Sequence, residues 1–152
     1  LKEAGADVTV VGSTATTFTG KAGTAVTADA GAEAVSVADF HGLVIPGGYA
    51  PDLMRRHPAM VALVRDCFLA GKPVAAICHA GWMLASAKIL KGRRVTSFFA
   101  IRDDLVHAGA EWVDAEVVVD GNLVTSRTPD DLPAFMRALI AVMGQGGEPG
   151  NP

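Results

Sequence analysis

The chain has 152 residues, half of them hydrophobic, which is enough for one core and too few for two comfortable domains. Its 13 basic and 16 acidic residues give a net charge of −3 and lie scattered, a pattern that indicates neither a nucleic-acid-binding nor a membrane-surface protein. No window approaches the roughly 18 apolar residues of a membrane span, and two cysteines are too few for a disulfide framework. We therefore expect one cytoplasmic domain over residues 1–143, followed by a flexible Gly/Pro-rich tail over 144–152.

The first third of the chain is expected to contribute little chemistry. Residues 1–6 predict the end of a helix closed by Gly5, and β-branched residues predict a strand over 8–12. Residues 13–34 are rich in Thr, Gly and Ala with weak alternation, which predicts a hairpin-like excursion at the sheet edge.

A buried strand is predicted over residues 42–45, and it runs into the loop Pro46-Gly47-Gly48. Two glycines leave backbone N–H groups unobstructed, so this loop could bind an oxyanion beyond the strand's carboxyl end. A short helical turn is predicted over 51–56, with Asp52 near its N-terminus. Asp52 has two interpretations of similar weight, as a plain helix-start residue or as a catalytic acid.

The segment from residue 58 to 89 predicts a helix, a buried strand and a second helix. Apolar residues repeat at helical spacing over 58–68, so Cys67 is expected to fill the core. Residues 74–77 form a continuous apolar run, typical of a strand covered on both faces, and helical spacing resumes at Trp82. Cys78 therefore falls on the turn between strand and helix.

The turn at Cys78 has the pattern of a nucleophile elbow. Ala76-Ile77-Cys78-His79-Ala80 reads small-x-nucleophile-x-small, which permits a sharp reversal and predicts a strained backbone at Cys78. At the first turn of a helix the sulfur meets free N–H groups and the positive end of the helix dipole, which favour thiolate. The alternative is a plain core cysteine, because free Cys is among the most buried residue types.

The second half of the chain predicts further elements of an α/β sheet. A strand is expected over 95–97, a short helix over 101–108 closed by Gly109, and a hairpin of residues 115–119 and 123–126 around Asp120-Gly121-Asn122. The last helix is expected over 129–142, with one apolar face formed by Leu132, Phe135, Met136, Leu139, Ile140 and Met143. His41, His57, His79 and His107 lack ligand-like spacing, so no metal site is expected.

The chain resembles the ThiJ/PfpI superfamily, in particular the PfpI intracellular-protease branch of class I glutamine-amidotransferase-like folds. The resemblance runs through LVIPGGYAPDLMRR, AGKPVAAICHAGWMLASA, LKGRRVTS, IRDDLVHAGAEWVDAEVVVDGNLVTSR and PDDLPAFMRALI. It implies a flavodoxin-like doubly wound α/β fold and a cysteine hydrolase or glyoxalase/deglycase without a cofactor. It also implies Cys78 as nucleophile, His79 as its neighbour, an oxyanion site at Gly48 and the His79 N–H, and Asp52 as the acidic residue. In PfpI-like members that acid approaches from a neighbouring subunit, so a homo-oligomer is expected.

The chain departs from the family pattern in three places. It has Cys78-His79-Ala80-Gly81 where the family usually has Cys-His-Gly-Pro, and Phe98 where a tyrosine commonly follows Thr-Ser. The family's catalytic glutamate, its first strand and most of its first helix lie upstream of Leu1, which is about 20 residues by mean element lengths. We therefore expect a slot one strand wide between residues 8–11 and 43–45, with no direct ladder joining them.

Two functions from different classes follow from these residues. The first is an enzyme in which Cys78 attacks a carbonyl of a peptide, a glycated group or a 2-oxoaldehyde. The second is a non-catalytic thiol redox sensor or chaperone-like stress protein that uses the same cysteine, because an exposed reactive thiol is also readily oxidised.

Overall fold

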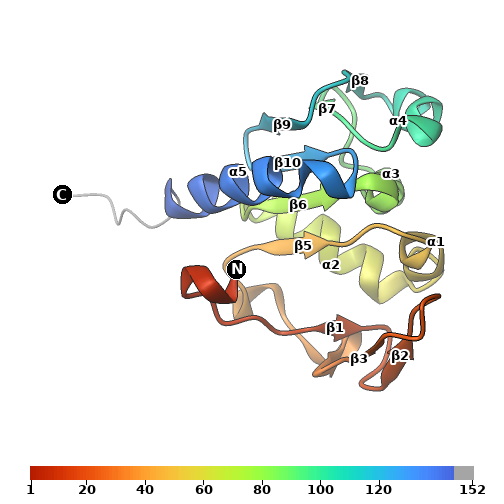
Figure 1. Cartoon of the computed structure of the whole chain (residues 1–152), viewed down its shortest axis with the longest axis vertical. Helices are drawn as coiled ribbons and strands as arrows, with labels where there is room; N and C mark the ends of the chain where they lie inside the picture. Colours follow the sequence, from red (N-terminus) through yellow and green to blue (C-terminus); the bar gives the residue numbers. More distant parts are fainter. Residues whose placement is uncertain (146–152) are drawn as a thin grey trace.

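A four-stranded sheet forms the centre of the computed structural model, which describes residues 1–145 (Figure 1). Its strands lie in the order β5 (Leu43–Ile45), β6 (Val74–Ile77), β10 (Leu123–Ser126) and β9 (Val117–Asp120). β5 and β10 run parallel to β6, and β9 closes the sheet as the antiparallel partner of β10. The hairpin at Asp120-Gly121-Asn122 is thereby confirmed.

Helices cover both faces of this sheet, as a doubly wound α/β fold requires. Val74 and Ala76 of β6 face one cluster with α2 (Pro58–Leu69) and α3 (Gly81–Ser86), while Ala75 and Ile77 face α5 (Leu132–Gln145). All four β6 residues are buried, because successive side chains of a central strand point to opposite covered faces.

The remaining elements are short and surround the sheet. They are the 3₁₀ turns η1 (Lys2–Ala4), η2 (Ala32–Ala34), η3 (Val37–Asp39), η4 (Cys78–Ala80), η5 (Phe99–Ile101) and η6 (Pro129–Asp131), the helices α1 (Ala50–Met54) and α4 (Arg102–His107), and the strands β1 (Val11–Gly12), β2 (Thr17–Thr19), β3 (Ala25–Thr27), β4 (Ala30–Gly31), β7 (Arg94–Val95) and β8 (Glu111–Trp112). β2 and β3 pair as an exposed antiparallel hairpin, which confirms the predicted excursion.

Three sequence-based boundaries were wrong. The strand predicted over 8–12 is only β1. The ladder with β4 starts at Val11, because the Val10 N–H donates to the Asp29 side chain. The strand predicted over 95–97 is β7, which starts at Arg94 and ends at Val95, because the next N–H, of Thr96, donates to the Thr125 side chain. Helix α5 continues through Gly144 and Gln145, where the tail was expected to begin. The rest of that predicted tail, 146–152, lies outside the described residues.

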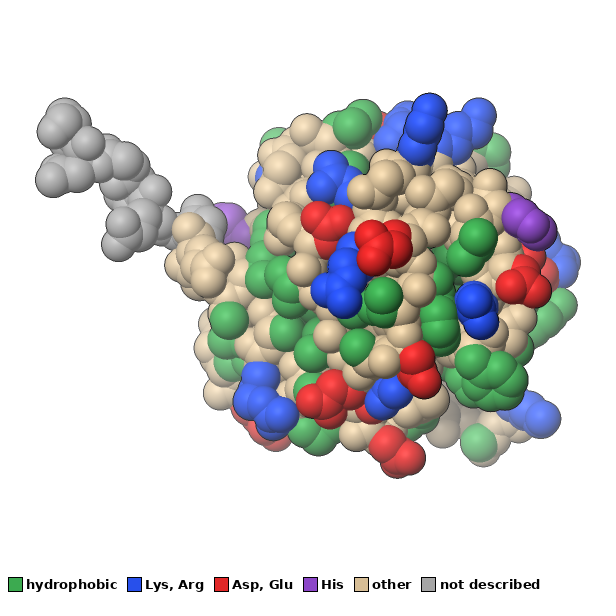
Figure 2. All heavy atoms as spheres, turned by 90° about the horizontal axis from the view of Figure 1, so that it is seen from above, with side chains coloured by type: hydrophobic (Ala, Val, Ile, Leu, Met, Phe, Trp, Pro, Cys, Tyr) green, Lys and Arg blue, Asp and Glu red, His purple; other side chains and the backbone are tan. Residues whose placement is uncertain are grey.

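Burial also corrects two predictions. Val44 of β5 is 37% exposed, although residues 42–45 were expected to form a buried strand. Leu132 and Ile140 of α5 are each 43% exposed, because the side of the helix that packs on the sheet is centred on Phe135 and Leu139. Figure 2 shows acidic, basic and apolar side chains interspersed on one face, as the scattered charge of the sequence predicts.

An open cleft of about 1210 Å³ separates the N-terminal segment from β5. Its walls include Val8, Val10, Val44 and all five methionines of the chain, Met54, Met60, Met83, Met136 and Met143. As expected, no ladder joins 8–11 to 43–45 among the described residues, since β1 pairs with β4 and β5 pairs with β6 (Figure 1). The N-terminal side of this cleft is open to solvent, with Val8 at 39% and Val10 at 37% exposed.

This cleft is expected to accept one added β-strand. An apolar strand would pair with the free edge of β5 and cover the exposed valines, so a synthetic six-residue Val/Ile-rich peptide should raise the melting temperature. We expect about 5 °C or more at a hundredfold excess over its dissociation constant. Differential scanning calorimetry measures this shift. The same peptide with alternate residues replaced by proline cannot donate to the ladder and serves as control; equal shifts with both peptides would contradict strand pairing.

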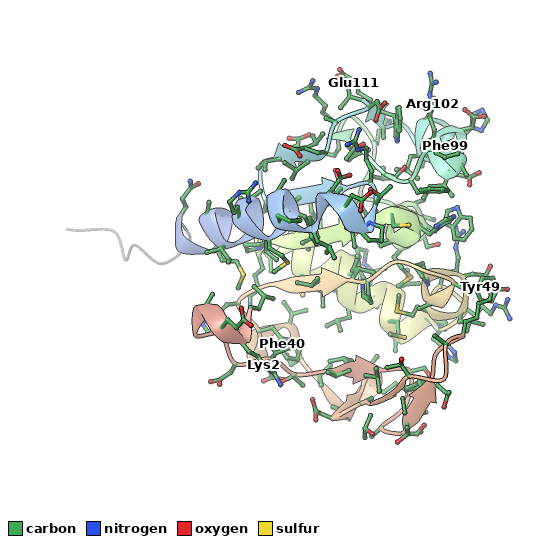
Figure 3. All side chains as sticks on the ribbon, in the orientation of Figure 1. Lys2, Phe40, Tyr49, Phe99, Arg102 and Glu111 are labelled. Atoms are coloured by element: carbon green, nitrogen blue, oxygen red, sulfur yellow. The ribbon has the colours of Figure 1, made fainter. Side chains whose placement is uncertain are left out.

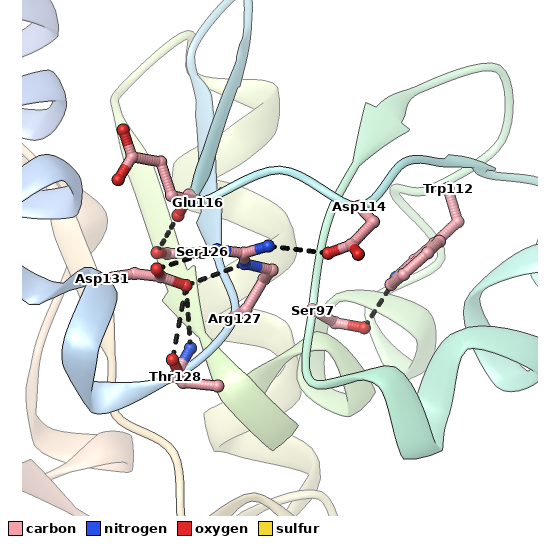
Figure 4. Close-up of polar contacts among 8 residues, drawn as sticks. All are labelled: Ser97, Trp112, Asp114, Glu116, Ser126, Arg127, Thr128 and Asp131. Atoms are coloured by element: carbon pink, nitrogen blue, oxygen red, sulfur yellow. Dashed lines mark hydrogen bonds and ion pairs between the residues drawn. The ribbon is translucent and has the colours of Figure 1, made fainter.

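A charged network at the end of β10 fixes the start of α5 (Figure 4). Arg127 contacts both Asp131 carboxylate oxygens, Nε–Oδ2 at 2.9 Å and Nη2–Oδ1 at 3.0 Å, and reaches Asp114 at 2.7 Å. Asp131 also accepts from the Thr128 N–H at 3.3 Å and completes a capping box. The Arg127 guanidinium lowers the pKa of the Asp131 carboxyl. The carboxylates of Asp131 and Asp114 in turn raise the pKa of Arg127.

Asp131→Asn is expected to lower the free energy of unfolding by roughly 1.5–3 kcal/mol at pH 7, because it removes a bidentate charge-assisted contact. The folded pKa of Asp131 lies below its unfolded value of about 3.9. Its contribution is therefore complete above about pH 4 and is lost as pH falls through the folded pKa. Urea unfolding at pH 7, 5 and 3.5 measures the difference in free energy of unfolding between wild type and Asp131→Asn. We expect this difference to narrow only at the lowest pH. Asp130→Asn, at an exposed neighbouring position, is the control.

Candidate active site

Cys78 lies at the end of β6, on the sharp turn that leads through η4 into α3. Its φ of 62° places a non-glycine residue in the left-handed region, which confirms the predicted strain at this position. Ala76 and Ala80 on either side are 2% and 0% exposed, so larger side chains would not fit there. Cys78 itself is partly exposed, so it is not a fully buried core cysteine.

The glycine loop after β5 packs directly against this elbow. A Cβ atom at Gly47 would lie 2.7 Å from the Cys78 Cβ, 3.1 Å from the Ile77 carbonyl oxygen and 3.4 Å from the Cys78 Sγ. The parallel register of β5 and β6 explains the approach, because Ile45 is opposite Ala76 and both strands end at the same edge. Only glycine permits the loop to come this close.

Gly48 supplies the conformational freedom that this loop needs. Its φ is +75°, a region that favours glycine. The Gly48 N–H donates to no backbone or side-chain acceptor within residues 1–145. The His79 N–H lies in the first turn of η4, where backbone N–H groups have no partner within the helix. These are the two donors predicted for the oxyanion site, and that role stays a prediction.

The His79 ring is held between the nucleophile and two aromatic rings. Its Nδ1 lies 3.3 Å from the Cys78 Sγ, close enough to exchange a proton with it. Trp82 makes an edge contact at 5.2 Å between ring centroids, and Phe98 lies at 4.9 Å with a 30° interplanar angle. Trp82 is itself anchored, since its Nε1 donates to Asp104 at 2.8 Å. Aromatic packing therefore orients this imidazole.

Asp52 does not contact His79 within the described chain. Its carboxylate pairs with Arg56 at 2.5 Å, one helical turn away. The hydrogen bond from Arg56 is the main reason that the pKa of Asp52 is lowered, with a smaller contribution from Tyr49, so Asp52 is a carboxylate at neutral pH. The structure brings Cys78, His79 and the Gly47-Gly48 loop together and leaves Asp52 on α1 with a different partner.

The two cysteines differ in their surroundings, as expected. Cys67 lies on the buried face of α2 and is 0% exposed, and burial raises the pKa of its thiol. Cys78 is the reachable thiol. No group of three or more His, Cys, Asp or Glu that could hold a metal occurs among residues 1–145, and no helix in that range is long and apolar enough to cross a membrane.

Two site residues were missed in the sequence. The Phe98 N–H donates to the Cys78 carbonyl at 3.2 Å, so this residue fixes the elbow as well as the histidine ring. Trp82 had been assigned only to the helix after the elbow. The spacing of three residues between His79 and Trp82 on one helical face could have indicated their contact. The contact between His79 and Phe98 joins distant segments, so residue spacing could not have indicated it.

The chain is similar to known proteins over nearly its whole length. The family model described as "DJ-1/PfpI family" matches residues 1–142. "Deglycase PfpI" of Pyrococcus furiosus is 46% identical over 143 residues, which cover 94% of this chain and 86% of that protein. "General stress protein 18" of Bacillus subtilis is 47% identical over 146 residues, which cover 94% and 85%. A crystal structure of a two-domain Anabaena variabilis protein with dj-1/thij/pfpi-like and ferritin-like domains has a TM-score of 0.91 at 41% identity and covers 99% of this chain and 44% of that one.

Proposed function

The chain belongs to the DJ-1/PfpI family, and on that premise we propose that it is a cysteine-dependent enzyme in which Cys78 attacks the carbonyl carbon of a 2-oxoaldehyde or of a group glycated by one. The observation that carries this proposal is the strained Cys78, whose Sγ lies 3.3 Å from the His79 ring and against the Gly47-Gly48 loop. Strain of this kind persists at functional sites because surrounding structure holds it.

The first step forms a bond between Sγ and the aldehyde carbon. The carbonyl electron pair moves to oxygen, where the N–H groups of Gly48 and His79 would stabilise the negative charge. Protonation of that oxygen gives a hemithioacetal. The proton on the former aldehyde carbon then moves to the neighbouring carbonyl carbon, and the hydroxyl proton moves to the oxygen of that carbonyl. The product is a thioester of a 2-hydroxy acid, from which water releases the acid and the thiol. Oxidation of one carbon balances reduction of the other, so no external oxidant or cofactor is needed.

Hydrolysis of peptides uses the same first step. Attack on an amide would give a tetrahedral adduct in the same oxyanion site, then an acyl-enzyme. The experiment that tests the proposal therefore measures D-lactate formation from methylglyoxal beside aminopeptidase-type hydrolysis. The proposal expects lactate formation by the wild type. Hydrolysis without lactate would assign the peptide reaction to this site.

The second candidate is a thiol redox sensor. It is favoured by the absence, within residues 1–145, of any carboxylate recorded on His79, because a site without an acid/base partner keeps a reactive sulfur but loses proton transfer worth about 10²–10⁴-fold. The similarity to a general stress protein points the same way. Absence of both activities, together with reversible Cys78 oxidation by peroxide, would favour the sensor.

Asp52 is proposed to reach His79 from a neighbouring subunit. If so, Asp52→Asn should lower kcat/KM by about 10²-fold through loss of histidine orientation, with little change in the folding of the isolated chain. Steady-state kinetics and light scattering together test this. Asp66→Asn, which removes an exposed carboxylate paired with Arg65 at 3.0 Å, is the matched control. A stable monomer with full activity would contradict a role for the neighbour.

A further inference from the structure

Beyond the proton-transfer groups, one side of the site is formed only by aromatic rings. Phe98 lies on His79 at 4.9 Å, and Phe99 continues the stack at 4.6 Å from Phe98 with an interplanar angle of 42°. Phe98 is half-buried and tied to the Cys78 carbonyl, whereas Phe99 is 71% exposed. The stack therefore extends from the nucleophile outward to solvent.

The glycine loop occupies another side of Cys78. The Gly47 backbone approaches so closely that even a methyl group there would lie 3.4 Å from Sγ. The loop that follows carries the Gly48 N–H, which is the place for the carbonyl oxygen. On another side of Sγ lies the His79 ring, whose Nδ1 is 3.3 Å away and on which Phe98 packs.

Phe99 is presented to solvent at the catalytic end of the molecule. Figure 3 shows Phe99 at the end toward which β5 and β6 run, the end that also carries Tyr49 of the glycine loop. Phe98 carries no hydroxyl and packs against both His79 and Phe99, so the exposed apolar face of this stack is that of Phe99. An exposed aromatic ring of this kind suits a flat apolar group, which gains stacking with offset or tilted rings.

We propose that Phe98 and Phe99 form a stacking surface that receives an aryl group carried next to the substrate carbon that bonds to Cys78. As a statement about substrate class, this rests on the proposed function: the preferred carbonyl compounds are those with an aromatic substituent, such as aryl 2-oxoaldehydes, over methyl-substituted ones. The surface itself requires only that the Cys78 thiol is reachable.

Alkylation of Cys78 tests the stacking surface without requiring catalytic turnover. Iodoacetanilide and iodoacetamide react alike, since Sγ displaces iodide and forms one C–S bond with loss of a proton, but the first carries a phenyl ring. The second-order rates at Cys78, each divided by the rate with glutathione, are measured by peptide mass spectrometry. We expect a wild-type preference for the phenyl reagent of about fivefold, falling to near one in Phe99→Ala, as an aromatic pair of this strength implies.

Leu69→Ala is the matched control, because Leu69 is also 71% exposed and lies at the end of α2 away from the site. It should keep the wild-type preference, and Phe99→Leu should keep only part of it. The proposal would be overturned if the wild type showed no normalised preference for iodoacetanilide over iodoacetamide. It would also be overturned if the preference were unchanged in Phe99→Ala. Lack of lactate formation with the preference intact would overturn the proposed enzyme and leave the stacking surface standing.

Discussion

Cys78→Ser should reduce turnover of a 2-oxoaldehyde by at least about 10³-fold, because it removes the nucleophile while keeping its shape. A serine hydroxyl needs a strong general base to attack a carbonyl. The His79 ring is oriented by aromatic packing, and no carboxylate among residues 1–145 hydrogen-bonds to it. D-lactate formation and unfolding by urea should be measured together. We expect a lost activity and a nearly unchanged stability, since Cys78 is only partly buried.

Cys67 provides the internal control for that substitution. Cys67→Ala leaves the only reachable thiol in place, so activity per folded molecule should stay within about twofold while a core cavity lowers stability by roughly 1 kcal/mol. Substantial turnover by Cys78→Ser, or loss of turnover in well-folded Cys67→Ala, would show that the elbow cysteine is not the nucleophile.

Gly47→Ala should lower kcat/KM by about 10²-fold. The added Cβ would lie 2.7 Å from the Cys78 Cβ and 3.1 Å from the Ile77 carbonyl oxygen, so the loop and elbow must separate. That movement displaces the Gly48 N–H from the position where the oxyanion forms, and a displacement of about 1 Å costs on this order. Because chemistry suffers more than binding, kcat should fall more than KM rises.

Gly144→Ala is the control for adding a methyl group, since a Cβ at Gly144 meets nothing within 4 Å. It should leave kinetics unchanged and favour helix α5 slightly. If Gly47→Ala retained wild-type kcat, the close approach of the glycine loop would have no part in the reaction.

Local patterns predicted the site's core because its geometry is local. The alternation of small residues around Cys78 requires only neighbours in sequence, and the backbone took the strained φ that the pattern implied. The glycine loop was placed correctly for a related reason: parallel strands β5 and β6 bring their carboxyl ends to one edge whatever the rest of the chain does.

Features that depend on distant partners were not predictable in the same way. Val8–Val10 has the composition of a strand, yet a strand needs a partner, and β1 forms only where β4 lies alongside. Val44 has a core residue's chemistry but faces the open cleft. The stacking of Phe98 on His79 likewise depends on how the segment after β7 packs against the elbow. Residue spacing along the chain does not predict this packing.

The most direct measurement of the central claim is a titration of activity against covalent labelling of each cysteine. Iodoacetamide added in increasing substoichiometric amounts should modify Cys78 first, leaving the buried Cys67 unlabelled. If Cys78 is the nucleophile, the fraction of D-lactate-forming activity lost equals the fraction of Cys78 labelled, along a straight line to zero. Activity that persists when Cys78 is fully labelled, or that follows the labelling of Cys67, would contradict the account.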